Sequence, residues 1–139
     1  MNVACCCHVL NLLVKDVISG VEGFQDILDN ATTIAKFCRR GRIYSTITER
    51  QKEEMGKVVA IKLWVKTRWT SIVQCLESLI INKSYIQQSC FMTSLAKKWR
   101  TKKGPLVKDR ILNEQVWEGM VRVLAYVKPI VATLMAYAR

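Results

Sequence analysis

The N-terminal segment contains the residues whose types and spacing come nearest to a chemical site. Cys5 and His8 are three positions apart, so a helix would place both side chains on one face. A thiolate and an imidazole can both bind zinc, but a structural zinc ion needs four ligands, and no second Cys or His pair follows. We therefore expect no metal site and no cofactor. The rival interpretation is a Cys–His nucleophilic pair, which predicts a thiol of lowered pKa but has no identifiable orienting partner.

The other isolated cysteines are interpreted as core residues. Cys38, Cys75 and Cys90 each stand alone at apolar positions of expected helices, where cysteine behaves as a small apolar side chain. The chain exceeds the size of small disulfide frameworks and shows no secretory signal, so we expect reduced thiols in a soluble protein. No run approaches about 18 uninterrupted apolar residues, and a membrane partner is therefore not expected.

Positive charge is the strongest physical indication of a partner. Lys and Arg number 22 against 11 Asp and Glu, a formal net charge of +11 at pH 7, which favours a polyanion. The first basic cluster contains Lys36, Arg39, Arg40 and Arg42, and the second contains Lys97, Lys98, Arg100, Lys102 and Lys103, followed by Lys108 and Arg110. Such clusters bind phosphate, act as nuclear import signals or are solvated faces. We expect low-affinity DNA binding and a nuclear location.

Arg68 and Trp69 place a planar cation next to a large aromatic side chain. Arg68 could donate paired hydrogen bonds to a phosphate or a base edge, or it could be an ordinary solvated cation. Trp69 could stack on an unpaired base, a contact typically worth about 1–3 kcal/mol. The alternative is that Trp69 anchors its helix in the core, which residue type alone favours because tryptophan is usually largely buried.

The elements that must position these residues are predicted to be helices, in a single all-α domain of five or six helices over residues 1–139. Apolar residues recur at three- and four-residue spacing in the N-terminal half. The clearest helix carries acids near its start and bases near its end, and Gly41 is predicted to stop it. Thr46 and Glu49 have the spacing of a capping box, which predicts a third helix that ends at Gly56.

The middle of the chain changes character. Residues 57–66 alternate apolar and polar side chains, the period of extended backbone, but no partner strand is visible. We therefore predict an extended connection there. Thr67 is predicted to cap the helix that follows, and Ser84 with Gln87 is predicted to open another helix toward residue 95.

The C-terminal third is predicted to be a loop followed by one long helix. Residues 97–108 contain Gly and Pro among the cations, and we expect a basic loop. Asn113 is predicted to cap the last helix. Pro129 should kink that helix, because proline lacks an N–H and clashes with the preceding turn.

Three segments together resemble transposases of the hAT superfamily. Residues 5–16, Cys-Cys-Cys-His-Val-Leu-Asn-Leu-Leu-Val-Lys-Asp, are similar to the family's Cys-x-x-His and the Leu-Asn-Leu-rich helix that follows it. Residues 67–71, Thr-Arg-Trp-Thr-Ser, are similar to the family's Thr-Arg-Trp-x-Ser segment. Residues 99–129 resemble the same region of a hAT-derived domain of unknown function that is common in plants, fungi and oomycetes. The resemblance in the order and spacing of the three segments covers nearly the whole chain.

The resemblance implies a role for each matching residue. The family has a ribonuclease H-like core that holds divalent metal with an Asp-Asp-Glu triad, and a large all-helical domain is inserted into that core. Cys5 and His8 would lie near the active site. Arg68 and Trp69 would lie in the insertion, where the tryptophan is placed to stack on a base flipped out beside the cut.

The sequence departs from the family at the catalytic residues. The strands that would carry both catalytic Asp residues and the segment that would carry the Glu are absent, and Asp16 and Asp109 match no triad position. A two-metal site needs those carboxylates. We therefore expect a fragment of the helical region that contacts DNA without independent catalysis. The alternative is a helical protein–protein interaction module that self-associates through exposed apolar surface and ignores DNA.

Overall fold

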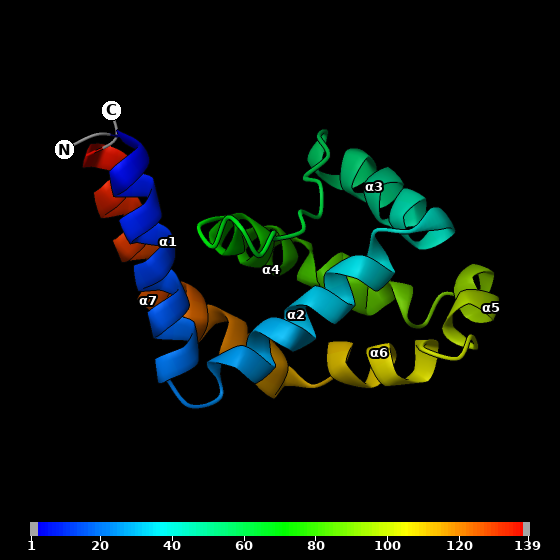
Figure 1. Ribbon diagram of the computed structural model, residues 1–139. Coiled ribbons are helices and arrows are strands. Elements are labelled where there is room, and N and C mark those ends of the chain that lie inside the picture. Colours follow the sequence, from blue (N-terminus) through cyan, green and yellow to red (C-terminus); the bar gives the residue numbers. More distant parts are fainter. Residues whose placement is uncertain (1–2, 138–139) are drawn as a thin grey trace.

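The computed structural model describes residues 3–137, and these residues are helical over most of their length (Figure 1). The elements are α1 (Val3–Gly20), α2 (Phe24–Cys38), α3 (Gly41–Met55), α4 (Ser71–Ser89), the 3-10 helix η1 (Thr93–Leu95), α5 (Ala96–Trp99), α6 (Gly104–Ile111) and α7 (Glu114–Tyr137). The all-α prediction is confirmed. The expected number of helices is wrong, because this part of the chain forms seven α-helices rather than five or six. None of them combines the length and apolar character that crossing a membrane requires.

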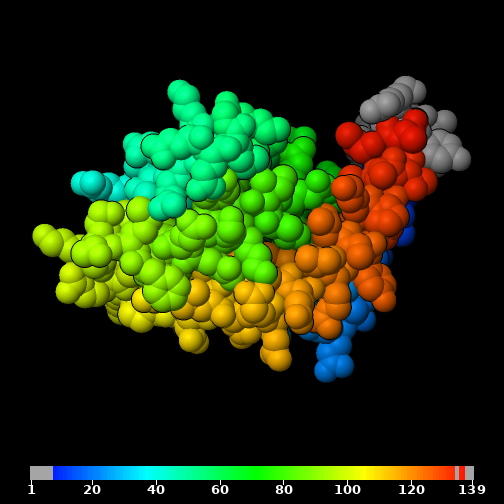
Figure 2. All heavy atoms as spheres, turned by 180° about the vertical axis from the view of Figure 1, so that it is seen from behind, coloured from blue at the N-terminus to red at the C-terminus, as the bar shows by residue number. Residues whose placement is uncertain are grey.

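The first and last helices pack side by side. α1 and α7 run in opposite directions along each other, so both ends of the described chain lie at the same side of the molecule (Figure 1). Leu10, Val14 and Ile18 form the buried face of α1, one turn apart as the sequence predicted. The same spacing also predicted Leu13 on this face, and that prediction is wrong, because Leu13 is 43% exposed. The last turns of α7, orange to red in Figure 2, stand out from the body that α3 to α6 form.

The extended connection between α3 and α4 is confirmed, and side chains supply its hydrogen bonds. Gln51 Oε1 accepts a hydrogen bond from the Val59 N–H at 3.0 Å, and Asn82 Nδ2 donates to the Val59 carbonyl at 3.0 Å. Ser78 Oγ accepts from the Lys62 N–H at 2.9 Å. Gln51 and Asn82, both fully buried, also bond to each other. These polar side chains of α3 and α4 replace the partner strand that the backbone groups lack.

The boundary between α2 and α3 differs from the prediction. α2 ends at Cys38, and Gly41 is the first residue of α3 rather than the stop of α2. Gly41 has φ +53°, a left-handed conformation that lets the chain turn back within two residues. The capping box predicted at Thr46 is therefore wrong, because Thr46 lies inside the helix. Gly56, with φ +73°, ends α3 as predicted.

α4 begins later and continues further than predicted. Thr67 does not cap it, because the helix starts at Ser71, whose Oγ accepts from the Val65 N–H at 2.9 Å. The helix boundary predicted at Ser84 and Gln87 is wrong. Both residues lie inside α4, which continues because it buries apolar side chains on either side of them.

The basic loop predicted for residues 97–108 is also wrong, since most of it is helical. α5 and α6 occupy this stretch, separated by a short turn. Pro105 lies in the first turn of α6, where its missing N–H would have had no helical partner. The sequence pattern of Gly and Pro therefore marks a helix start here. The last helix continues through Pro129 to Tyr137.

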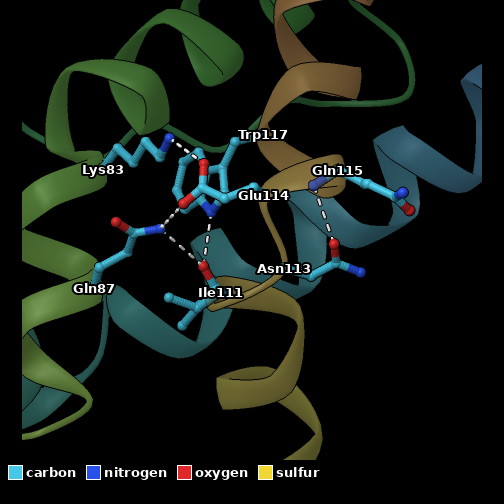
Figure 3. Close-up of polar contacts among 7 residues, drawn as sticks. All are labelled: Lys83, Gln87, Ile111, Asn113, Glu114, Gln115 and Trp117. Carbon is cyan, nitrogen blue, oxygen red and sulfur yellow. Dashed lines mark hydrogen bonds and ion pairs between the residues drawn. The ribbon is translucent and has the colours of Figure 1, made fainter.

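The start of α7 is fixed by polar contacts to α4 (Figure 3). Asn113 caps α7 as predicted, because its Oδ1 accepts from the Gln115 N–H at 3.0 Å. The Glu114 carboxylate accepts hydrogen bonds from Lys83 Nζ at 2.6 Å and from Gln87 Nε2 at 3.0 Å. The hydrogen bond from Lys83 and then that from Gln87 lower the pKa of Glu114.

The end of α6 is closed at the same junction. The Ile111 carbonyl is one of the last carbonyls of α6, which have no partner within the helix. Trp117 Nε1 donates to it at 2.7 Å, and Gln87 Nε2 donates to it at 3.2 Å (Figure 3). α4, α6 and α7 are thereby joined around one carbonyl oxygen.

We predict that Glu114→Gln lowers the free energy of unfolding at neutral pH and that this loss disappears in acid. A carboxyl whose pKa is lower in the folded state stabilises the fold above its unfolded-state pKa, and this stabilisation is lost as the pH falls through the folded-state pKa. Urea denaturation of both proteins between about pH 7 and pH 3 measures the difference. Glu118→Gln, which removes the same charge from an exposed position of α7, is the control. A difference that is constant over this range would contradict the role of Lys83 and Gln87.

Candidate nucleic-acid interface

The two basic clusters predicted from the sequence meet on the surface. The first lies where α2 ends and α3 begins, and the second lies on α5 and the turn before α6. Figures 1 and 2 both show the beginning of α3 beside α5, at the end of the molecule opposite the paired tips of α1 and α7. Residues far apart in the sequence therefore contribute to one surface.

Two adjacent hollows, which we call together the basic groove, lie between these clusters. One, of about 360 Å³, is lined by Phe37, Arg40, Gly41, Ile43, Lys98, Thr101, Lys102 and Lys103. The other, of about 250 Å³, is lined by Thr32, Thr33, Lys36, Phe37, Arg40, Lys103 and Val107. Phe37, Arg40 and Lys103 line both hollows. Among the residues that line them there is no Asp or Glu, so the groove offers only positive charge to a ligand.

The remaining predicted cations lie outside the basic groove. Arg39, Arg42 and Lys97 are exposed but line neither hollow. Arg100 lines a different hollow, on the side of α5 that faces Phe91. Arg39 and Arg42 are nevertheless next to Arg40 and Gly41 in the chain, so they add to the positive potential around the groove.

The start of α3 adds hydrogen-bond donors to the groove. Arg40 is the N-cap of α3, and its side chain makes no capping hydrogen bond. The first N–H groups of a helix have no partner within the helix, and together with the helix dipole they favour an anion. Because Arg40, Gly41 and Ile43 line the groove, these donors lie beside its cations. The arrangement suits a phosphate group.

An aromatic contact holds the two sides of the groove together. The ring of Phe37, from α2, packs on the ring of Trp99, from α5, with 5.1 Å between the ring centroids. Trp99 is buried, and its Nε1 donates a hydrogen bond to the Ser89 carbonyl at 2.8 Å, at the end of α4. α5 is thereby fixed to both α2 and α4, and the positions of Lys98 and Lys103 follow from that packing.

Arg68 and Trp69 are not part of the basic groove. Trp69 is half-buried and packs on Trp64, with 5.2 Å between the ring centroids. Trp64 Nε1 in turn donates to Thr32 Oγ1 at 2.6 Å. Arg68 is exposed and lines a separate hollow of about 500 Å³.

That separate hollow joins two of the three motif segments. Its lining includes Asn11 from α1, Arg68 from the turn before α4, and Val131 from α7. Asn11 Nδ2 donates to the Thr67 carbonyl at 3.4 Å, while its Oδ1 is buried without a partner. The first and second motif segments therefore meet at this contact.

The cysteines divide into two groups. Cys38, Cys75 and Cys90 are buried and free, as predicted. Burial raises the pKa of Cys75 and of Cys90, each to about 11, and raises that of Cys38 as well, so these three thiols are protonated at neutral pH. Cys5 lies outside the residues whose side chains the structure describes, whereas His8 is exposed on α1. Within the described residues, no three His, Cys, Asp or Glu side chains gather closely enough to hold a metal ion.

The functional assignment depends on this geometry. Comparison of the chain with family models, with curated proteins and with solved structures found no match. The roles of Cys5, His8, Arg68 and Trp69 therefore stay predictions. The basic groove is the candidate binding surface that both the charge pattern of the sequence and the packing of the helices support.

Sequence reasoning missed Phe91. Its side chain is 69% exposed, and Lys108 Nζ lies 5.2 Å from the centroid of its ring. The sequence predicted a helix up to residue 95, in which an aromatic residue would be taken for a core position. α4 ends instead at Ser89, and the turn that follows leaves Phe91 on the surface. Finding the exposed position of Phe91 from the sequence would have required a correct prediction of where α4 ends.

We predict that Gly104→Ala destabilises the protein and disturbs the groove. A Cβ atom at position 104 would lie 2.1 Å from the Trp99 carbonyl oxygen and 2.6 Å from its carbon, and backbone atoms cannot yield as a side-chain end can. Overpacking of this kind typically costs about 1–3 kcal/mol. Chemical denaturation followed by circular dichroism measures the loss. Gly20→Ala is the matched control, because a Cβ there meets nothing within 4 Å, and it should be neutral or stabilising.

Proposed function

We propose that this chain binds DNA through the basic groove, with low affinity and little sequence preference. The observation that carries the proposal is the groove itself, where cations from two distant clusters face one another with no acid among them. The cations of the groove are Lys36, Arg40, Lys98, Lys102 and Lys103. Contacts of this kind are made to phosphates, which carry no sequence information, and they weaken as salt rises.

Electrostatic free energy favours a polyanion at this site. The side chains of the groove are held near one another by the packing of α5 on α2, so their mutual repulsion is present before a ligand arrives. A phosphate backbone replaces that repulsion with attraction and releases its own counterions. The uncapped N–H groups at the start of α3 supply hydrogen bonds in the same place.

We also propose that the chain is related to the helical region of hAT transposases. The three motif segments support this, as does the all-α fold. The pairing of α1 with α7 is a further support, because a helical domain inserted into another fold needs its two ends close together (Figure 1). In this proposal the chain contacts DNA but does not cut it, since Asp16 and Asp109 match no position of the family's metal-binding triad.

A second candidate function is self-association. Val9, Leu12 and Leu13 form an apolar group on the surface of α1, with 42%, 45% and 43% of their surfaces exposed. Apolar side chains gathered in this way are typical of a contact surface. A protein that forms dimers or larger particles in sedimentation experiments but binds no DNA at low salt would favour this candidate over the first.

The proposal predicts that reversing two charges of the groove abolishes most of the binding. Arg40→Glu with Lys103→Glu replaces the two cations that line both hollows. Fluorescence anisotropy with labelled duplex DNA, measured over a salt series, should show at least about tenfold weaker binding for the double variant and a shallower salt dependence, because fewer phosphates are neutralised.

The matched control is Lys15→Glu with Lys57→Glu. Both lysines are exposed and lie outside the groove, and the change in net charge is the same. If the control loses as much affinity as the groove variant, the binding follows overall charge and the assignment to the groove is wrong. Absence of wild-type binding at low salt, or binding that ignores salt, would remove the proposed function altogether.

A further inference from the structure

We infer that the hollow beside Phe91 is a stacking site for an unpaired base, so that the preferred ligand of this surface is single-stranded DNA. This inference rests on the proposed DNA-binding function and names the form of DNA. It assigns the stacking role to Phe91 rather than to Trp69, which the sequence had singled out.

Phe91 has the exposure that stacking requires. Its side chain is 69% exposed, the highest value among the large apolar residues whose side chains the structure describes, and it lies just after the end of α4. The hollow beside it has a volume of about 600 Å³ and an apolar wall that includes Met92, Trp99 and Pro105. A nucleobase is flat and can cover such a ring, and base–aromatic stacking tolerates any base because every base has a π-face.

Cations frame the same hollow. Arg100 and Lys108 both line it, and Lys108 Nζ lies 5.2 Å from the centre of the Phe91 ring. An aromatic platform beside cations is the arrangement by which proteins bind single strands, since the ring takes the base while the cations take its phosphate. In a duplex the bases are stacked on each other and their faces are not accessible. The hollow therefore favours an unpaired segment.

The stacking site is next to the basic groove. Trp99 lines the Phe91 hollow, and the ring of Phe37 that packs on it lines both hollows of the groove. Successive residues of α5 and its following turn divide between the two sides, since Lys98 and Thr101 line the groove while Trp99 and Arg100 line the Phe91 hollow. A strand that passes around α5 would meet phosphate sites first and a stacking site next.

Trp69 is less suited to this role. It is half-buried against Trp64, whose indole is itself tied to Thr32. Using the face of Trp69 that meets Trp64 would require breaking that packing. Phe91, by contrast, belongs to none of the aromatic ring pairs among the described residues, and the Lys108 ammonium group lies over its ring.

The test compares three labelled DNA probes of equal length by fluorescence anisotropy at low salt: oligothymidylate, an abasic strand and a duplex. Phe91→Ala should weaken binding of oligothymidylate about fivefold or more, the loss expected when one stacked base is removed. It should leave the abasic strand and the duplex unchanged, because these probes keep phosphates but offer no free base. Phe91→Trp should retain or strengthen oligothymidylate binding.

Leu106→Ala is the matched control, since Leu106 is 53% exposed and lines none of the three hollows. Circular dichroism checks that each variant is folded. If Phe91→Ala binds oligothymidylate as the wild type does, or if its binding of all three probes is weakened equally, the stacking site is wrong. Neither result would contradict DNA binding by the groove. If the wild type binds none of the probes at low salt, the proposed function falls with the inference.

Discussion

The basic groove depends on an apolar contact beneath it, the packing of Phe37 on Trp99. Two like charges about 4 Å apart repel each other by about 1 kcal/mol when both are fully hydrated, but by about 4 kcal/mol where the protein surface lowers the effective dielectric constant to about 20. Salt screens hydrated charges further. Burying an aromatic side chain stabilises a fold by about 1.5–3 kcal/mol. The aromatic contact therefore outweighs the repulsion, provided that the cations keep their access to water. This explains why the charges lie on the rim while the rings lie below.

α4 connects this groove to the rest of the molecule. Its buried polar side chains, Ser78 and Asn82, hold the connection that precedes it, and the Ser89 carbonyl at its end holds the indole of Trp99. Polar groups inside a core stabilise only when all of them are bonded, and here they bond to backbone groups that would otherwise have no partner. One helix thus positions both a segment without secondary structure and the short helix that carries Lys98.

The sequence predicted what depends on local pattern. The buried face of α2, the cap at Asn113 and the members of both clusters could be found from spacing and charge. It did not predict the continuity of α4, because serine and glutamine fit a helix interior as well as a cap. The start of α6 was predicted to be a loop, since Gly104 and Pro105 are as typical of a loop as of the first turn of a helix. The meeting of the clusters could not be predicted, because it depends on a contact between residues far apart in the chain.

The pairing of the first helix with the last has a consequence for the order of folding. α7 packs on α1, α2 and α4, so the parts of their apolar faces that it covers stay open until α7 has been synthesised. Contacts between distant parts of a chain slow folding and leave apolar surface open meanwhile. Phe24, whose buried ring packs on the Tyr126 ring of α7, would be exposed to other chains during that interval. The apolar faces of α1, α2 and α4 are therefore most open to aggregation in the interval between their own synthesis and that of α7.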